Sequence, residues 1–322
     1  MPRVSVIIPA HNAAAFLREA LQSVRDQTFS DWEVIAVDDG SADATWSILE
    51  AGGSRVRAFR NASATGPAAA RNRALEHATG ELVAFLDADD LLLPQFLERQ
   101  IACLRRAASE NRNVGIVACD ALLLDEDTYA GYTYLDQIPS RDRPKPLTLD
   151  RILERNPIYI SSLVPTAVGE AVGWFDVELF GTEDFGLWVK ILERGYEAIL
   201  NPEPLAVYRR HTGTVSSNIA RQGANNRRTY ELALARGALS PRQRAIARRG
   251  VRYNRAMEVV ATLRFRPPGH ASARQVVRAL PLLAWVALTN PRWWKQWVAV
   301  LRTGRQPVAG RPRGKRAQDE RA

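Results

Sequence analysis

Two aspartates with one residue between them follow a short apolar run in this chain. The run at residues 82–86 reads LVAFL, and Asp87 and Asp89 come directly after it. Carboxylate oxygens are hard donors, and ions such as Mg²⁺ usually bind through one or two carboxylates together with substrate phosphates. At the end of a predicted strand, the pair indicates a site for a divalent cation and a diphosphate. Most isolated Asp-x-Asp triplets are solvated turns, so this motif alone is only a hypothesis.

Two further polar clusters follow apolar runs in the same way. Residues 9–12 (PAHN) come after the run at 4–8, and residues 38–41 (DDGS) come after the run at 33–37. In an open parallel sheet the ligand crevice lies outside the carboxyl ends of the strands. We therefore expect these clusters and the aspartate triplet to meet at one edge of a sheet. An ordinary turn explains each cluster taken singly, but three such clusters at one edge favour a site.

The elements that would position these clusters alternate along the first 120 residues. Runs rich in β-branched residues predict strands at residues 4–8, 33–37, 55–59, 82–86 and 114–118. Apolar residues at helical spacing predict helices at residues 14–27, 43–50, 66–78 and 94–107. Such alternation is typical of an α/β fold, with a mostly parallel sheet flanked by helices.

The middle of the chain is less regular. Residues 125–165 include a Pro- and Arg-rich stretch, and we expect an insertion or a loop over the crevice. A helix is predicted to begin after Thr182, which can serve as its N-cap, and to end before Gly195. A short strand at 205–209 then leads to His211.

The net charge changes sign along the chain. Residues 1–220 carry a net charge of −10 and residues 221–322 one of +19, so the overall charge of +9 hides an acidic N-terminal part. Arg-rich helices are predicted at 227–261 and 271–301. The predicted division of the chain is an α/β domain at residues 1–220, a basic helical extension at 221–304 and a disordered basic tail at 305–322.

A basic C-terminal segment is typical of proteins that bind nucleic acid or an anionic membrane surface. The apolar run at 279–290 has 12 residues, fewer than the roughly 20 that span a bilayer. Tryptophans near residue 295 stand among cations, as in interfacial amphipathic segments; a solvated helix packed on the rest of the protein is the alternative. Since the N-terminus lacks a secretory signal, we expect a cytoplasmic protein whose residues 271–322 contact the inner face of the cell membrane.

With these clusters in view, the chain resembles the family 2 inverting glycosyltransferases, which have the Rossmann-like GT-A fold. The resemblance covers residues 4–217, and the C-terminal hundred residues lie outside it. It implies a nucleoside-diphosphate-sugar donor, most often a UDP-sugar, a Mg²⁺ or Mn²⁺ ion, and a glycan or lipid-linked acceptor in cell-surface polysaccharide synthesis. The motifs that carry it are residues 4–12 (VSVIIPAHN), 27–33 (QTFSDWE), 37–41 (VDDGS), 66–72 (GPAAARN), 85–90 (FLDADD), 173–176 (GWFD), 183–184 (ED) and 208–211 (YRRH).

The resemblance also implies roles for residues on the donor side. Asp39 would accept a hydrogen bond from the imide N–H of the base, which suits a carboxylate because it only accepts. Arg71 would neutralise the nucleotide side, and Asp87 would reach the ribose directly or through the water shell of the metal. The residues expected around the nucleotide are Pro9, His11, Asn12, Asp39, Gly66, Arg71 and Asp87.

By the same resemblance, Asp89 would ligate the metal together with Asp87, and His211 would complete the metal site or touch the diphosphate. The general base that deprotonates the acceptor hydroxyl would lie in the pair Glu183 and Asp184. We favour Asp184 as the base, with Glu183 orienting the acceptor or the base. The simpler explanation of the pair is that anionic side chains are favourable at a helix N-terminus, by about 0.3–1 kcal/mol. For His211 the simpler explanation is a plain surface histidine.

Three other functions fit parts of the sequence. A sugar nucleotidyltransferase would also use an α/β nucleotide fold and a divalent metal, but it would open with a Gly-rich loop, and residues 4–12 contain no glycine. A nucleic-acid-binding protein would explain the basic C-terminal part, with strong salt dependence, but not the acidic clusters. A catalytically inactive sugar-nucleotide binder is disfavoured by the presence of Asp87, Asp89 and Asp184.

Overall fold

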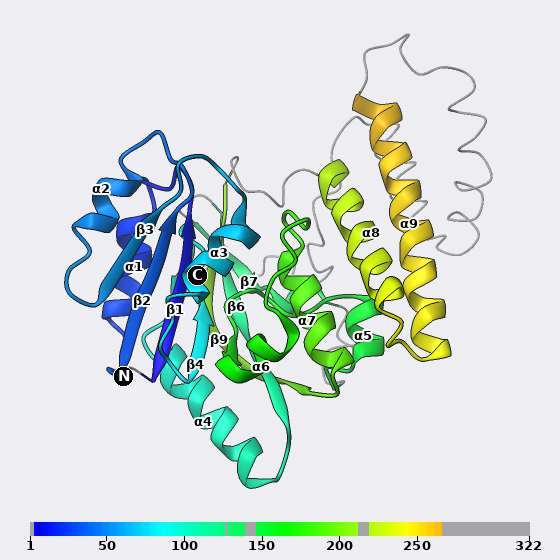
Figure 1. Cartoon of the computed structure of the whole chain (residues 1–322), viewed down its shortest axis with the longest axis horizontal. Coiled ribbons are helices and arrows are strands. Elements are labelled where there is room, and N and C mark those ends of the chain that lie inside the picture. The colour runs from blue at the N-terminus through cyan, green and yellow to red at the C-terminus, as the bar shows by residue number, and fades with distance from the viewer. Residues whose placement is uncertain (1–2, 126–127, 139–145, 212–218, 266–322) are drawn as a thin grey trace, which may run out of the picture.

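The computed structural model describes residues 3–125, 128–138, 146–211 and 219–265 (Figure 1). The strands are β1 (Val4–Ala10), β2 (Trp32–Asp38), β3 (Val56–Arg60), β4 (Leu82–Phe85), β5 (Leu91–Leu92), β6 (Val114–Asp125), β7 (Thr128–Thr133), β8 (Leu163–Pro165) and β9 (Glu197–Arg210). The helices are α1 (Leu17–Arg25), α2 (Thr45–Glu50), α3 (Pro67–Leu75), α4 (Phe96–Ser109), the short 3-10 helix η1 (Leu135–Gln137), α5 (Leu149–Glu154), α6 (Thr166–Val172), α7 (Glu183–Glu193), α8 (Ile219–Arg236) and α9 (Pro241–Phe265).

The N-terminal half of the sheet is parallel, as predicted. The strands run in the order β3-β2-β1-β4, and every pair among them is parallel. All seven residues of β2 and six of the seven in β1 are buried, which explains why both read as nearly continuous apolar runs. The α/β class is thus confirmed, and the carboxyl ends of β1, β2 and β4 lie at one edge.

The other half of the sheet is mixed. It continues from β4 in the order β8-β6-β9-β5, with β7 paired to β6. The pairs β4–β8, β8–β6, β9–β5 and β6–β7 are antiparallel, and β6–β9 is parallel. Strand β9 starts at Glu197, before the predicted strand at 205–209. Pro202 and Pro204 lie where the β6–β9 register shifts, and such irregular positions tolerate proline.

Residues 125–165 are more structured than the sequence suggested. Their described part contains β7, the short 3-10 helix η1, α5 and β8. Helix α6, which follows β8, was not predicted because seven residues give too short a pattern. This stretch is therefore only in part the loop that we expected.

The helix predicted at 227–261 is wrong at one point, because Gly237 with φ +75° opens a break that separates α8 from α9. The two helices lie side by side, next to α5 and α7 (Figure 1). Ion pairs join them to the acidic domain: Arg228 to Glu178 at 2.6 Å and Arg242 to Asp150 at 2.8 Å. Part of the basic charge of residues 221–265 therefore pairs with acidic residues of the α/β domain.

The predicted helix at 271–301 and the basic tail lie outside the described residues. Within the described ranges, none of the helices has both the length and the apolar character needed to cross a bilayer.

Candidate active site

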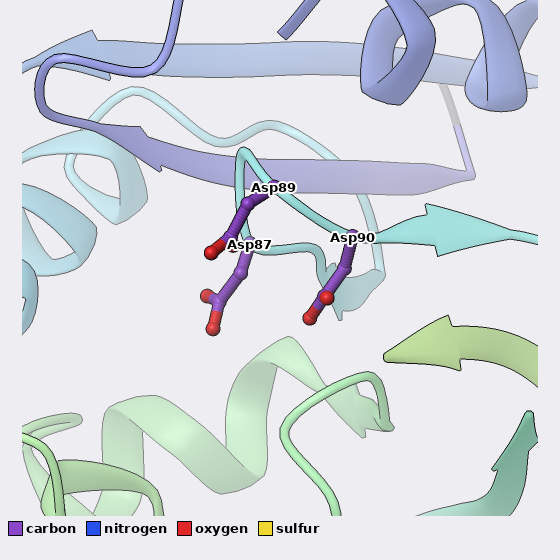
Figure 2. Close-up of side chains that lie close together, drawn as sticks. All are labelled: Asp87, Asp89 and Asp90. Carbon is purple, nitrogen blue, oxygen red and sulfur yellow. The ribbon is translucent and has the colours of Figure 1, made fainter. Parts of the chain in front are cut away.

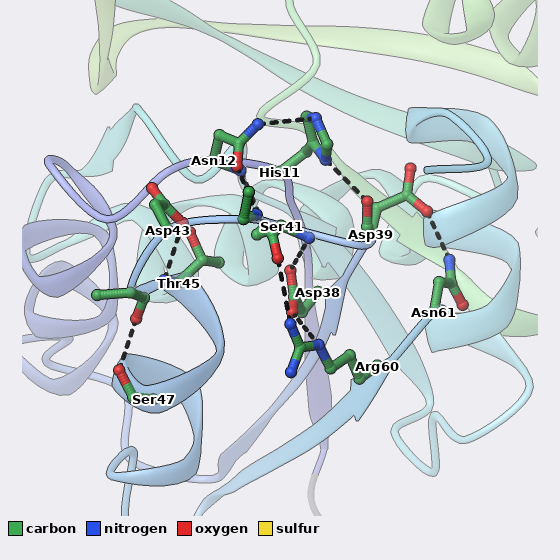
Figure 3. A network of polar contacts seen from close by, with 12 residues as sticks. His11, Asn12, Asp38, Asp39, Ser41, Asp43, Thr45, Ser47, Arg60 and Asn61 are labelled. Atoms are coloured by element: carbon green, nitrogen blue, oxygen red, sulfur yellow. Dashed lines mark hydrogen bonds and ion pairs between the residues drawn. The ribbon is translucent and has the colours of Figure 1, made fainter. Parts of the chain in front are cut away.

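The first two polar clusters meet at the carboxyl ends of β1 and β2, as predicted (Figure 3). The backbone N–H of Asn12 donates to Ser41 Oγ at 2.9 Å. His11 Nδ1 donates to the carbonyl oxygen of Asp39 at 2.8 Å. Because a carbonyl only accepts, Nδ1 carries the proton, and His11 Nε2 accepts from Asn12 Nδ2 at 3.0 Å. Pro9 lies in β1, two residues before His11.

The carboxylate of Asp39 organises the loop that follows β3. It accepts hydrogen bonds from Asn61 Nδ2 at 2.6 Å, from the hydroxyl and the backbone N–H of Thr65 at 2.8 and 2.9 Å, and from the N–H of Gly66 at 2.7 Å. Burial opposes ionisation, but these donors outweigh it and lower the pKa of Asp39. The side chain is therefore an ionised acceptor in which most lone pairs are already used.

A cavity of about 380 Å³ opens beside this loop, at the lower end of the size range of small-molecule sites, about 300–1,000 Å³. Arg60 from β3 forms part of its wall, and its Nε forms an ion pair with Asp38 Oδ2 at 3.0 Å. The residues that line the cavity are Gly40, Ser41, Arg60, Asn61 and Ala62.

Asp87, Asp89 and Asp90 follow β4, and one carboxylate oxygen of each lies within 4.8 Å of those of the other two (Figure 2). Asp90 is 1% exposed and is already engaged, because its Oδ2 accepts from the Tyr159 hydroxyl and its Oδ1 accepts from the N–H of Arg209. Asp87 uses only Oδ1, for Arg71. In the described part of the chain, Asp87 and Asp89 thus each retain an oxygen for a cation. Two hard oxygen donors in the one turn after β4 fit Mg²⁺ or Mn²⁺.

His211 lies beside this cluster, as predicted. Its Nε2 is 3.0 Å from Asp89 Oδ2, and its ring packs 4.8 Å from that of Phe16 in the segment before α1. Burial, reinforced by the charge of Asp87, raises the pKa of Asp89. The imidazole of His211 therefore lies close to the carboxylates of Asp87 and Asp89, more than 120 residues earlier in the sequence.

Arg71 joins Asp87, in the turn after β4, to α7. Its side chain is 3% exposed; Nη1 donates to Glu183 Oε1 at 2.6 Å, and Nη2 donates to Asp87 Oδ1. The guanidinium also lies 5.5 Å from the centre of the Phe175 ring. Both carboxylates raise the pKa of Arg71 despite its burial, so the cation is permanent and holds two acidic residues from different elements.

Glu183 and Asp184 occupy the first turn of α7, as predicted, but their environments differ. Glu183 is 6% exposed, and besides Arg71 it accepts a hydrogen bond from the N–H of Gly181 at 2.6 Å. Asp184 accepts at Oδ1 from the N–H of Phe185 at 2.6 Å and is partly exposed. Burial and the neighbouring charge of Glu183 raise the pKa of Asp184 to about 7. A carboxyl with such a pKa can take up a proton near neutral pH.

Several residues of the site were not predicted from the sequence. Asn61 and Thr65 hold Asp39; the turn-forming composition of residues 61–66 was the available signal. Tyr159 and Arg209 hold Asp90, and Arg209 stands inside the motif quoted around His211, whereas Tyr159 carried no local signal.

The sequence matches a known family over its first part. The profile described as "Glycosyl transferase family 2" matches residues 5–119. Over 223 residues the chain is 34% identical to the glycosyltransferase TuaG of Bacillus subtilis (strain 168), whose name connects it with teichuronic acid biosynthesis; the match covers 67% of this chain and 82% of TuaG. Over 217 residues it is 29% identical to WfgD of Escherichia coli, named a UDP-Glc:alpha-D-GlcNAc-diphosphoundecaprenol beta-1,3-glucosyltransferase, with 67% and 80% covered.

Solved structures share the fold at lower sequence identity. TarS of S. aureus, in complex with UDP-GlcNAc, has a TM-score of 0.62 and 20% identity over 87% of this chain and 80% of that chain. The mannosyltransferase PcManGT of Pyrobaculum calidifontis, in complex with GDP-Man and Mn²⁺, has a TM-score of 0.60 and 22% identity over 93% and 85%.

Proposed function

The chain belongs to glycosyltransferase family 2 and has the GT-A fold, and from that premise we propose that it is a metal-dependent inverting enzyme. It would move a sugar from a nucleoside diphosphate to a hydroxyl group of a glycan or lipid-linked acceptor. The observation that carries the proposal is that one buried arginine links the aspartates of the candidate metal site to the helix of the candidate base. Ligand atoms of Asp87 and Asp89 lie within 4.8 Å of one another, Arg71 bonds to both Asp87 and Glu183, and Asp184 follows Glu183 in α7.

We propose a uridine nucleotide as the donor. WfgD is named for UDP-Glc and the TarS structure contains UDP-GlcNAc, whereas the PcManGT structure contains GDP-Man. Asp39 is the residue proposed to meet the base, because a carboxylate only accepts and the imide N–H of uracil only donates. Four donors, from Asn61, the hydroxyl and N–H of Thr65, and Gly66, already bond to it, about as many as a carboxylate can accept. The imide N–H would therefore replace one of these donors.

Asp87 and Asp89 would hold the divalent cation, with His211 as a candidate third ligand. When bound, Mg²⁺ or Mn²⁺ supplies a Lewis acid that stabilises negative charge on the departing diphosphate. Arg71 would also help to orient the metal ligands. Arg71 fixes one oxygen of Asp87, so the orientation of this carboxylate is set before any ligand arrives.

Asp184 would act as the general base. The acceptor hydroxyl must lose its proton as its oxygen bonds to the anomeric carbon, and a carboxylate on the face opposite the leaving group can take that proton. Attack from that face inverts the anomeric configuration. Glu183, with one oxygen on Arg71 and the other on the N–H of Gly181, would hold Asp184 in place and would not itself contact the acceptor.

For the acceptor we propose a lipid-linked or cell-surface glycan. WfgD is named for a diphosphoundecaprenol-linked sugar and TuaG for teichuronic acid biosynthesis. Residues 271–322, which lie outside the described part, carry eleven Lys and Arg against two acidic residues. Such a segment would be attracted to an anionic membrane surface, and we propose that it holds the enzyme there peripherally.

The test is a panel of UDP-, GDP- and dTDP-sugars with Mn²⁺, scored first by protection against thermal unfolding and then by turnover. We expect the largest protection from a UDP-sugar, a loss of protection in EDTA, and turnover lost in Asp89→Ala and Asp184→Asn. Protection that EDTA leaves unchanged, or undiminished turnover of either variant, would contradict the proposal.

A further inference from the structure

Helix α8 lies against the turn that leads into α7. Asn225 donates from Nδ2 to the carbonyl oxygen of Phe180. Four residues later on the same helix, Thr229 Oγ1 lies 3.4 Å from Thr182 Oγ1, and both threonines are buried, with 1% and 4% exposure. Thr229 also donates to the carbonyl of Asn225 at 3.2 Å, within α8. The side chains of Asn225 and Thr229 thus contact the residues just before Glu183.

The turn at residues 180–182 is held by Glu183 of α7 and also by α8. Thr182 occupies the N-cap position, yet its side chain makes no capping hydrogen bond to the helix; the hydroxyl that was predicted to cap α7 lies against Thr229. Gly181 has φ +77°, a conformation that side chains rarely adopt. Because Thr182 makes no capping bond, the first turn of α7 is held by the Glu183 carboxylate, which bonds to the N–H of Gly181 and to Arg71, and by the contacts of α8 with residues 180 and 182.

Phe185, the residue after Asp184, also contacts α8. The ring of Tyr230 packs edge-on against that of Phe185, with centroids 5.4 Å apart and planes at 75°. Tyr230 in turn donates its hydroxyl to the carbonyl of Leu153 in α5 at 2.9 Å. The residues on both sides of Glu183 and Asp184 are therefore in contact with α8, a helix outside the stretch that the family profile matches.

We propose that α8 belongs to the catalytic unit, and that Asn225 and Thr229 are positioning residues that fix the 180–182 turn and thereby place Asp184 against the acceptor. This inference rests on the proposed function, because it takes Asp184 as the base. It places the end of the catalytic unit beyond the boundary at residue 220 that the sequence predicted. A base displaced by about 1 Å can cost on the order of a hundredfold in rate, so contacts of this kind can control turnover without touching substrate.

The test compares Asn225→Ala and Thr229→Val in the full chain. Each removes one polar contact with the turn, and Thr229→Val keeps the size of the side chain. We expect kcat to fall by about ten- to a hundredfold, while the KM for the sugar nucleotide and the thermal shift that UDP and Mn²⁺ produce stay within twofold of wild type. Thr229→Ser, which keeps the hydroxyl, should restore most of kcat.

The matched control is Arg236→Ala. Arg236 fastens the far end of α8 to Glu193 at 2.6 Å, at the last turn of α7. Its loss should lower Tm without lowering kcat, which separates loosening of the helix from displacement of the turn. If Asn225→Ala does not fold, Thr229→Val decides.

The inference is wrong if Thr229→Val keeps kcat within twofold of wild type, whatever its Tm. Asp184→Asn, measured in parallel, tells this failure apart from failure of the proposed function. An inactive Asp184→Asn beside a fully active Thr229→Val would overturn only the role of α8. An active Asp184→Asn would remove the base itself, and with it the proposed mechanism.

Discussion

Arg71 and Glu183 lie 112 residues apart in the sequence, and Arg71 Nη1 bonds to Glu183 Oε1 at 2.6 Å in the interior of the protein. The same guanidinium bonds to Asp87, which follows β4. One buried cation thus ties the turn that would hold the metal to the helix that carries Asp184. The contact fixes how the turn after β4 lies relative to the first turn of α7.

We predict that Arg71→Met destabilises the protein and abolishes turnover. Removing one partner of a buried ion pair leaves an uncompensated charge and costs about 3–5 kcal/mol. Adding Glu183→Gln removes one of the two stranded carboxylates, so the double variant should regain part of the lost stability. It should regain no activity, since α7 is no longer tied to Asp87. Urea unfolding and turnover assays measure the two effects.

Arg57→Ala is the control for Arg71→Met. Arg57 pairs with Glu33 at 3.3 Å; its own side chain is 44% exposed, and the buried Glu33 keeps hydrogen bonds from Ser5 and Thr79 when Arg57 is lost, so we expect a loss of at most about 1 kcal/mol. Equal losses of stability in Arg57→Ala and Arg71→Met would show that the Arg71 contacts contribute no more to stability than the Arg57 contact does.

The parallel half of the sheet could be predicted from the sequence because its signals are local. Buried strands give continuous apolar runs, and the polar cluster after each run, such as the one at 9–12, needs no knowledge of the rest of the chain. His211 could be connected with Asp89 only through resemblance, and the structure places them 3.0 Å apart. The break between α8 and α9 was missed, although Gly237 is the type of residue that ends a helix.

The pairing of buried side chains could not be predicted in the same way. Arg71 was expected beside the nucleotide, and its position on α3 was right, but no spacing rule shows that the guanidinium also reaches α7. No role was predicted from the sequence for Asp90, the neighbour of Asp89. Its role depends on Tyr159, which arrives from a region that gave no regular pattern. Contacts between distant segments are set by the tertiary fold, and single-sequence patterns do not contain them.

We predict that Asp89→Asn and Asp90→Asn affect different properties. Asp89→Asn removes a charged ligand and should weaken Mn²⁺ binding in the presence of UDP by at least tenfold. Asp90→Asn keeps polar groups facing the Tyr159 hydroxyl and the Arg209 N–H, so Mn²⁺ affinity should change by less than threefold. Calorimetric titration of Mn²⁺ measures both. If Asp90→Asn weakened Mn²⁺ as strongly as Asp89→Asn, Asp90 would have to be counted as a ligand.

We predict that Gly66→Ala lowers both stability and nucleotide affinity. Gly66 has φ +95° and ψ 160°, and an added Cβ would lie 3.3 Å from the Phe180 ring. A non-glycine residue in that conformation costs about 1–3 kcal/mol, and any shift of its N–H disturbs the bond to Asp39. Gly53→Ala is the control, because Gly53 has φ +81° with open space around it. It should lose stability without losing affinity for UDP, and equal UDP affinity in both variants would refute this account.

We predict that kcat rises with pH through about 7. The pKa of Asp184 is raised to about 7 by burial and by the charge of Glu183, and a general base works only when ionised. Below that pKa, kcat at saturating substrates should fall by about tenfold per pH unit, and above it the rate should level off. Assays between pH 5.5 and 8.5 give the profile. A rate that does not change between pH 6 and 8 would show that another group limits the reaction.

The same shift predicts that Asp184→Asn is more stable than the wild type at pH 8. The carboxyl titrates at about 7 in the folded protein and near 3.8 in the unfolded chain, so the folded state binds more protons between these values. The contribution of Asp184 to stability is therefore present at low pH and lost as the pH rises through that window, by up to about 1.4 kcal/mol per pH unit. Asparagine is neutral throughout. Urea unfolding should thus show a gain for the variant at pH 8 and none near pH 4, where the wild-type carboxyl is also neutral. Equal stabilities at pH 8 would mean that Asp184 ionises without cost, in conflict with the raised pKa.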